Sequence, residues 1–218
     1  MIGLQGFRAE NRVKREIKAV IYDCDGVMFD SFEANFAFYR QVMERFGKAP
    51  LDRRDADTMR VLHTYCNKDV LSHLFAGDDR IDQVRAFSAT IDYRKLFPLM
   101  LMEQGLRETL DALQGRVELA VCTNRASSME MLLESFGLQG YFSCVMTAGR
   151  VVNPKPHPEP LMKVLEHYGI AAGEALFVGD SEVDRQAADA AGVPFIAYRG
   201  EMPARARIDR HQDLLLLL

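Results

Sequence analysis

Three apolar runs of the chain each end in polar residues that could do chemistry. They are "AVIY" before Asp23-Cys24-Asp25-Gly26, "LAVC" before Thr123-Asn124, and "LFVG" before Asp180-Ser181. Between the second and the third lies "NPKPHPEP", in which Lys155 stands between two prolines. Together these stretches offer three carboxylates, a hydroxyl and an ammonium. Such a set can hold a cation beside a phosphoryl group.

The carboxylates point to a magnesium ion. Mg²⁺ prefers oxygen ligands, and it is typically held by one or two carboxylates together with substrate phosphate. The side chains of Asp23 and Asp180 suit that role, with the backbone carbonyl of Asp25 as a further ligand. Without a cation, acids gathered in this way would repel one another.

The remaining polar residues suit the oxygens of a phosphoryl group. Lys155 supplies a point charge, and Thr123 supplies a hydroxyl donor. Gly26 and Asn124 allow backbone N–H groups to approach the same oxygens. Each residue taken singly also suits a turn, a helix cap or a solvated loop, and "GDSEVD" is a good helix start with Asp180 or Ser181 as the cap. Their occurrence in order, each near a strand end, favours a site.

The elements around these residues alternate between strand and helix. Short apolar runs predict strands at residues 18–22, 117–122, 142–148, 175–180 and 194–198. Helical spacing predicts helices at 103–115, 127–137, 157–169 and 182–192, and the leucines 214–218 are expected to close a final amphipathic helix onto the core. This alternation predicts an α/β fold, a doubly wound (Rossmann-like) parallel sheet that gathers ligands at the carboxyl ends of its strands.

One stretch of the chain carries only helical patterns. Helices are expected at residues 31–47, with Ser31 as N-cap, and at 52–66, 67–77 and 78–97. We therefore expect an α/β core formed by residues 1–28 and 98–218, and an all-helical domain at 29–97 inserted after the first polar stretch. Asp30, at the exit into this insert, is expected to act as a hinge or helix-capping residue outside the chemistry.

Composition narrows the setting of the protein. Its 218 residues, 48% hydrophobic, suffice for one domain with a smaller insert. The formal charge of -4 gives no reason to expect nucleic acid or an anionic membrane as partner. The four cysteines form no paired motif, no run approaches the length of a membrane span, and residues 1–20 lack the apolar core of a signal peptide. These features predict a cytoplasmic protein with reduced thiols, and they leave its oligomeric state open.

The polar stretches resemble the four motifs of the haloacid dehalogenase-like superfamily of phosphohydrolases. The matching residues are "DCDGVMFDS" (23–31), "CTN" (122–124), "KPHP" (155–158) and "GDSEVDRQAADAAG" (179–192). The helical insert is similar to the small cap of the phosphoglycolate phosphatase and β-phosphoglucomutase branch. The resemblance covers nearly all the chain from Lys18 onward.

This resemblance implies a role for each motif residue. Asp23 is expected to be the nucleophile that forms an aspartyl-phosphate, and Asp25 the general acid and then base, with a raised pKa or with a proton that arrives with the substrate. Thr123, Asn124 and Lys155 are expected to bind the phosphoryl oxygens. The metal ligands of Mg²⁺ are expected to be Asp23, Asp25 and Asp180, with Asp184 just outside them, through water or a contact to Lys155. A carboxyl group at position 25 suits ester hydrolysis, because it can protonate an oxygen leaving group.

Three functions are compatible with these residues. The first is a Mg²⁺-dependent phosphatase that hydrolyses a small phosphorylated metabolite through an aspartyl-phosphate. The second is a phosphomutase of the β-phosphoglucomutase type, a branch that often carries histidine where this chain has Asn35. The third is a catalytically inactive binding protein on the same fold. The substrate is expected to depend on the cap, where six polar side chains could face inward: Asn35, Arg53, Arg54, Arg60, His63 and Lys68.

Overall fold

The computed structural model describes residues 16–218. Residues 1–15 lie outside the described residues. Most of the segment that was predicted to lack the apolar core of a signal peptide therefore lies outside them too. Within the described chain, no helix is long and apolar enough to cross a membrane. All four cysteines are buried and unpaired.

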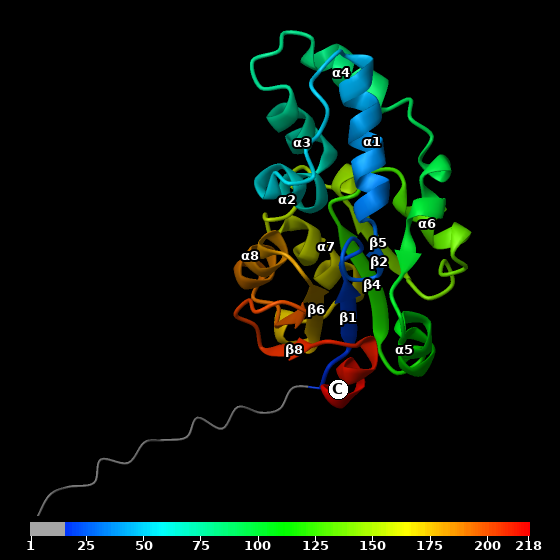
Figure 1. The fold of residues 1–218 in the computed structure, drawn as a ribbon. Helices are drawn as coiled ribbons and strands as arrows, with labels where there is room; N and C mark the ends of the chain where they lie inside the picture. The colour runs from blue at the N-terminus through cyan, green and yellow to red at the C-terminus, as the bar shows by residue number, and fades with distance from the viewer. Residues whose placement is uncertain (1–15) are drawn as a thin grey trace, which may run out of the picture.

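A six-stranded parallel sheet forms the centre of the molecule (Figure 1), as predicted. Its strands, in spatial order, are β5 (Cys144–Thr147), β4 (Glu118–Thr123), β1 (Ala19–Tyr22), β6 (Ala175–Gly179), β7 (Phe195–Tyr198) and β8 (Ala206–Ile208). Every neighbouring pair is parallel. The first five strands were predicted within a few residues, whereas the three-residue edge strand β8 was not.

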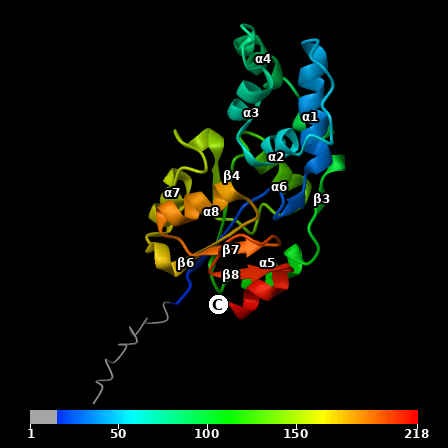
Figure 2. The ribbon, with the colours of Figure 1, turned by 60° about the vertical axis from the view of Figure 1, so that its left-hand side comes forward.

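Helices cover both faces of the sheet, which explains why every residue of β1 is buried. Val20 and Tyr22 point to the face packed against α5 (Leu106–Leu113) and α6 (Met129–Ser135). Ala19 and Ile21 point to the face packed against α7 (Glu159–Tyr168) and α8 (Glu182–Ala191). Figure 2 shows these two pairs of helices on opposite sides of the strands. The alternation along β1 therefore fixes its position between two apolar layers.

Four further helices stand beyond the carboxyl ends of the strands, and we call them the cap helices (Figure 1). They are α1 (Phe32–Arg45), α2 (Ala56–Thr64), α3 (Asn67–Leu74) and α4 (Ile81–Ser88). The expected last helix, 78–97, ends early, and two 3-10 helices, η1 (Tyr93–Lys95) and η2 (Phe97–Leu99), follow it. We propose the division into a core of residues 1–28 and 98–218 and a cap of 29–97, because the chain enters and leaves the cap helices beside β1.

A short antiparallel ribbon joins the two passages of the chain. It pairs β2 (Phe29–Asp30) with β3 (Leu101–Met102), and no sequence pattern predicted it. Asp30 accepts a hydrogen bond from the backbone N–H of Phe32 at 3.1 Å, so it caps the start of α1. Ser31, the predicted N-cap, makes no capping bond, because its hydroxyl binds a carboxylate of the core instead.

The carboxyl-terminal segment packs beneath the loop that carries Asp23 and Asp25. It forms a 3-10 helix, η5 (His211–Leu216), where an amphipathic helix was expected; Leu214 is buried against α5. His211 is fully buried, stacks on Tyr198 with ring centroids 4.6 Å apart, and has Nε2 3.0 Å from the carbonyl oxygen of Val27. Because a carbonyl only accepts hydrogen bonds, Nε2 of His211 carries the proton.

Candidate active site

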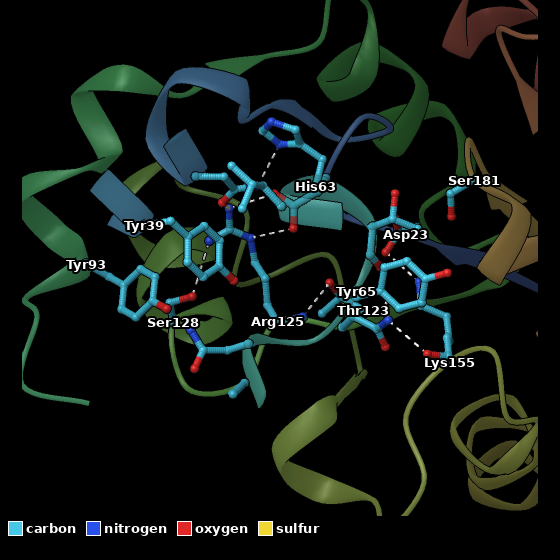
Figure 3. A pocket seen from close by; sticks show the side chains of 17 residues that line it. Asp23, Tyr39, His63, Tyr65, Tyr93, Thr123, Arg125, Ser128, Lys155 and Ser181 are labelled. Carbon is cyan, nitrogen blue, oxygen red and sulfur yellow. Dashed lines mark hydrogen bonds and ion pairs between the residues drawn. The ribbon is translucent and has the colours of Figure 1, made fainter. Parts of the chain in front are cut away.

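The sheet order brings the predicted site residues to one place. Strand β1 lies between β4 and β6, so Asp23, Thr123 and Asp180 follow three neighbouring strands at the same edge. A pocket between this edge and the cap helices is lined by Asp23, Asp25, Thr123, Asn124 and Lys155, among others (Figure 3). Its free volume is about 50 Å³. That is room for a few water molecules or a small organic group.

Lys155 occupies the centre of the buried charge network. Its Nζ lies 2.7 Å from Oδ1 of Asp23, 2.6 Å from Oδ1 of Asp184 and 3.0 Å from the carbonyl oxygen of Cys122. These three acceptors satisfy the three donors of the ammonium group. Although burial opposes its charge, the carboxylates of Asp184 and Asp23 raise the pKa of Lys155, so the group is a cation. The sequence analysis expected Asp184 to act either through water or through a contact to Lys155, and the structure shows the contact.

Three carboxylates converge at the position expected for a metal. Asp23, Asp180 and Asp184 each offer an oxygen within 4.8 Å of the others. Burial and then the charge of Asp184 raise the pKa of Asp23 to about 7, against the opposing effect of Lys155. Burial and the charges of Asp184 and Asp23 also raise the pKa of Asp180 well above its usual value. This excess of buried negative charge fits a divalent cation with oxygen ligands.

The three acids are not equivalent. Both oxygens of Asp184 have protein partners, because Oδ1 binds Lys155 and Oδ2 accepts from the backbone N–H of Ser181 at 3.1 Å and from its hydroxyl at 2.5 Å. Asp184 and Ser181 thereby form the capping box of α8. Part of Asp180 reaches solvent. This difference leaves Asp23 and Asp180 as the carboxylates with oxygens available to a metal ion.

Glycine is required at position 26 by the approach of Asp180. Gly26 has a φ of +79°, in the left-handed region. A Cβ atom added there would lie 2.0 Å from Oδ2 of Asp180. The tight turn after Asp25 therefore lets the loop of β1 and the end of β6 come together.

Asp25 is held by a residue that the sequence reasoning did not single out. Arg125 donates from Nε to Oδ2 of Asp25 at 2.8 Å and from Nη2 to Oδ1 at 2.7 Å, and the hydroxyl of Ser31 also donates to Oδ1. Burial favours a raised pKa, but the charge and hydrogen bonds of Arg125 outweigh it and lower the pKa of Asp25 below its usual value. The expectation of a raised pKa was therefore wrong. The alternative, a proton that arrives with the substrate, remains a prediction.

The side chain of Asn124 ties the core to the cap. Its Nδ2 donates to the carbonyl oxygen of Lys155 at 3.0 Å and to that of Thr64, at the end of α2, at 3.2 Å. The amide donors are thus engaged by protein, which leaves only the backbone N–H of Asn124 for a phosphate oxygen. Thr123 is buried beside it and lines the pocket, and its Oγ1 accepts from the backbone N–H of Arg125 at 3.2 Å.

Two of the six candidate cap residues line the pocket. Asn35 and His63 do so, and Nδ2 of Asn35 lies 3.2 Å from Nδ1 of His63, whose ring stacks on Phe32. Burial lowers the pKa of His63, so the ring is neutral at pH 7. The other four candidates do not line this pocket: Arg53, Arg54, Arg60 and Lys68.

Sequence reasoning missed several residues of the pocket wall. Besides Arg125 these include Tyr39, Tyr93 and Ser128. The contact of Ser31 with Asp25 was also not expected, because Ser31 was predicted only as a helix cap. The position of Arg125 directly after "CTN" was the available signal for it. The two tyrosines carry no such signal, because aromatic residues at helical spacing usually belong to a core.

Comparisons with known proteins agree with this fold. A crystal structure of a HAD-superfamily hydrolase, subfamily IA, variant 1, from Geobacter sulfurreducens superposes with a TM-score of 0.83 and 58% sequence identity, over 93% of this chain and all of that one. The CbbY protein of Rhodobacter sphaeroides, crystallised with phosphate, is similar in fold, with a TM-score of 0.77 at 18% identity over 91% of this chain and 96% of that one.

A curated relative shares part of the sequence. Phosphoglycolate phosphatase of Escherichia coli is 46% identical over 91 residues. That match covers 41% of this chain and about a third (36%) of the relative. The family model of the haloacid dehalogenase-like hydrolases matches residues 20–198, nearly the whole described chain. The protein therefore belongs to the haloacid dehalogenase-like hydrolase family.

Proposed function

We propose that the protein is a Mg²⁺-dependent phosphatase that hydrolyses a small phosphate monoester through an aspartyl-phosphate on Asp23. The observation that carries the proposal is the group of buried Asp23, Asp184 and Lys155 with the partly exposed Asp180 at the strand ends. The three carboxylates outnumber the single ammonium group, so a divalent cation would balance the excess charge, and a phosphate ester would supply further oxygen ligands to that cation.

In the first half-reaction an oxygen of Asp23 attacks phosphorus, and the bond from phosphorus to the ester oxygen breaks. The hydroxyl of Thr123 donates to a phosphoryl oxygen, and the positive charge of Lys155, which is held by Asp23 and Asp184, stabilises the charge that shifts onto the phosphoryl oxygens. Asp25 delivers a proton to the departing alcohol. Because Arg125 keeps Asp25 ionised in the free protein, that proton comes with the substrate, whose phosphate has a second pKa near about 6.

In the second half-reaction Asp25 removes a proton from water. The water oxygen attacks phosphorus of the aspartyl-phosphate, which releases inorganic phosphate and restores the carboxylate of Asp23. Asp25 thus gives a proton in one step and takes one in the next, which needs a carboxylate held in fixed orientation. The two hydrogen bonds from Arg125 provide that orientation.

The residues present fit a magnesium ion. The carboxylates of Asp23 and Asp180, with the backbone carbonyl of Asp25, would hold it, and Asp184 would orient Lys155 beside them. When bound, Mg²⁺ would neutralise charge on the phosphoryl oxygens.

The substrate is proposed from the pocket and from the partial relative. A pocket volume of about 50 Å³ favours a small phosphate ester. The relative named phosphoglycolate phosphatase supports a phosphorylated two-carbon acid as the first compound to test.

The proposal is tested by phosphate release. Purified protein is given p-nitrophenyl phosphate and a panel of phosphorylated metabolites, with Mg²⁺ or with EDTA. We expect turnover that disappears in EDTA and returns with added Mg²⁺. Absence of Mg²⁺-dependent release across the panel would contradict the proposal, and isomerisation of a sugar phosphate without net release would favour a mutase instead.

A further inference from the structure

Arg125 divides the pocket into two parts. In Figure 3 Asp23, Thr123 and Lys155 lie on one side of Arg125, and Tyr39, Tyr93 and Ser128 lie on the other. We call the second part the leaving-group chamber. Besides the guanidinium of Arg125, it is lined by Tyr39, Tyr93 and Ser128, and Oδ1 of Asn35 lies 3.4 Å from Nη2 of Arg125. A substrate with its phosphorus at Asp23 would extend its alcohol part towards this chamber.

The two edges of the Arg125 guanidinium differ in their hydrogen bonds. One edge makes short hydrogen bonds and the other makes long ones. Nε and Nη2 bind Asp25 at 2.8 and 2.7 Å. On the other edge, Nη1 lies 3.3 Å from the hydroxyl oxygen of Ser128, and Nη2 lies 3.4 Å from Oδ1 of Asn35 and 3.8 Å from the sulfur of Met100. The distances to the two oxygens exceed the usual 2.7–3.2 Å of a good N–H···O bond. The Nη1–Nη2 edge of a side chain only 7% exposed therefore has donors that the protein satisfies poorly.

The charges of the pocket wall single out the same edge. Among the described residues that line the pocket, Lys155 and Arg125 are the cations. Lys155 is already paired with Asp23 and Asp184. The rest of the leaving-group chamber consists of amides and hydroxyls, without a carboxylate of its own. An anion on the alcohol part would meet hydrogen-bond donors there, and the nearest carboxylate of the lining, that of Asp25, lies on the opposite edge of the same guanidinium.

We propose that Arg125 is the specificity-determining residue of the reaction, and that its Nη1–Nη2 edge binds an anionic group on the alcohol part of the substrate. The inference rests on the proposed function, because it names the substrate class of the same site. The anion is a carboxylate or a second phosphate, the two groups that a guanidinium edge binds with paired hydrogen bonds. Since Arg125 also holds Asp25, the anion must lie within a few bonds of the ester oxygen.

The test compares three esters built on two carbon atoms: 2-phosphoglycolate, ethane-1,2-diol bisphosphate and the neutral 2-hydroxyethyl phosphate. The ratio of kcat/KM for a charged ester to that for the neutral ester is measured with Mg²⁺. We expect the unmodified protein to prefer at least one charged ester by about 10- to 100-fold, the value of hydrogen bonds to a charged group. The ester that it prefers identifies the anion as carboxylate or phosphate.

Variants separate anion binding from the support of Asp25. In Arg125→Met the ratio should fall to within about 3-fold, and in Arg125→Lys to an intermediate value, because lysine keeps the charge and loses the paired geometry. Loss of support for Asp25 slows all three esters alike and leaves the ratio unchanged. Arg54→Met, on an exposed cap residue, is the matched control. An unchanged ratio in Arg125→Met overturns the inference. If Arg125→Met does not fold, an unchanged ratio in Arg125→Lys overturns it instead.

A binding measurement separates this inference from the proposed function. If the unmodified protein releases phosphate from none of the three esters, the proposed function fails. Calorimetry with Asp23→Asn then compares 2-phosphoglycolate with 2-hydroxyethyl phosphate in Mg²⁺. The role of Arg125 is supported if 2-phosphoglycolate binds about tenfold more tightly than 2-hydroxyethyl phosphate, and if this difference in affinity disappears in Asp23→Asn/Arg125→Lys. Equal affinities for the two esters contradict it.

Discussion

The guanidinium of Arg125 holds the carboxylate of Asp25 from a position one hundred residues further along the chain, and the two side chains are only 7% and 14% exposed. A buried ion pair stabilises a protein only as long as both charges remain. Arg125→Met leaves the Asp25 carboxylate without its partner, so we expect it to lower the free energy of unfolding by about 3 kcal/mol.

Urea unfolding at pH 7 measures this cost. Asp25→Asn/Arg125→Met should be more stable than Arg125→Met, because the unpaired charge is gone. Arg54→Met breaks an exposed ion pair with Asp52 and should leave the free energy of unfolding nearly unchanged, because water screens exposed charges. If Arg125→Met has the same free energy of unfolding as the unmodified protein, Asp25 and Arg125 do not form a buried charge pair in solution.

Asn124 should act on cap closure. Asn124→Leu removes the donors to the carbonyl oxygens of Lys155 and Thr64, so the closed arrangement of core and cap is weakened. We expect KM to rise about 3- to 10-fold, the value of one neutral hydrogen bond, with faster amide exchange in the last turn of α2. Unchanged KM and exchange would mean that Asn124 does not hold the cap.

Gly26 should control metal binding through Asp180. In Gly26→Ala the new methyl group would meet Oδ2 of Asp180, so we expect Mg²⁺ affinity to fall about tenfold or more. Gly47→Ala is the matched control, since Gly47 also has a positive φ but nothing within 4 Å of a new Cβ. It should cost about 1 kcal/mol of stability and leave Mg²⁺ affinity unchanged. Equal Mg²⁺ titrations of the two variants would contradict the prediction.

His211 should make the protein acid-sensitive. Burial lowers the pKa of His211 to about 4, against about 6.5 in an unfolded chain. The unfolded state therefore binds a proton first, and the stability due to the neutral ring is complete above pH 6.5 and is lost as the pH falls towards 4. At pH 5 the loss amounts to about 2 kcal/mol.

Urea unfolding at pH 7.5 and pH 5 tests this sign. His211→Gln should lose about 2 kcal/mol less than the unmodified protein between these pH values. The exposed His73, changed to Gln, is the control and should lose as much as the unmodified protein. Identical pH dependence of the unmodified protein and His211→Gln would show that His211 is not buried neutral.

Sequence patterns predicted the elements that are long and apolar. Strands β1, β4, β6 and β7 were recognisable because each is a buried run that stops at polar residues. The ribbon of β2 and β3 has two residues in each strand, too few to show any alternation. The helix expected at 78–97 ends at Ser88, and the side chain of Asp92 accepts from the backbone N–H of Arg94 and so starts the 3-10 helix η1 instead.

The site could be predicted in part for a similar reason. Residues at strand ends converge in any parallel sheet of this kind, so Asp23, Thr123 and Asp180 could be placed from the strand pattern alone. The pairing of Asp25 with Arg125 depends on side-chain directions across two loops. The raised pKa expected for Asp25 was wrong because that one buried cation outweighs the effect of burial.

The central claim is that Asp23 is the nucleophile. Asp23→Asn changes one carboxylate oxygen to an amide nitrogen, and Asp82→Asn makes the same change on an exposed side chain of α4 as a control. The direct measurement is the steady-state rate of phosphate release with Mg²⁺ for both variants, with thermal melts to show that each is folded. We predict that Asp23→Asn loses about 10³-fold or more of the rate while Asp82→Asn keeps it. A folded Asp23→Asn variant that still releases phosphate at a rate comparable to the control would contradict the account.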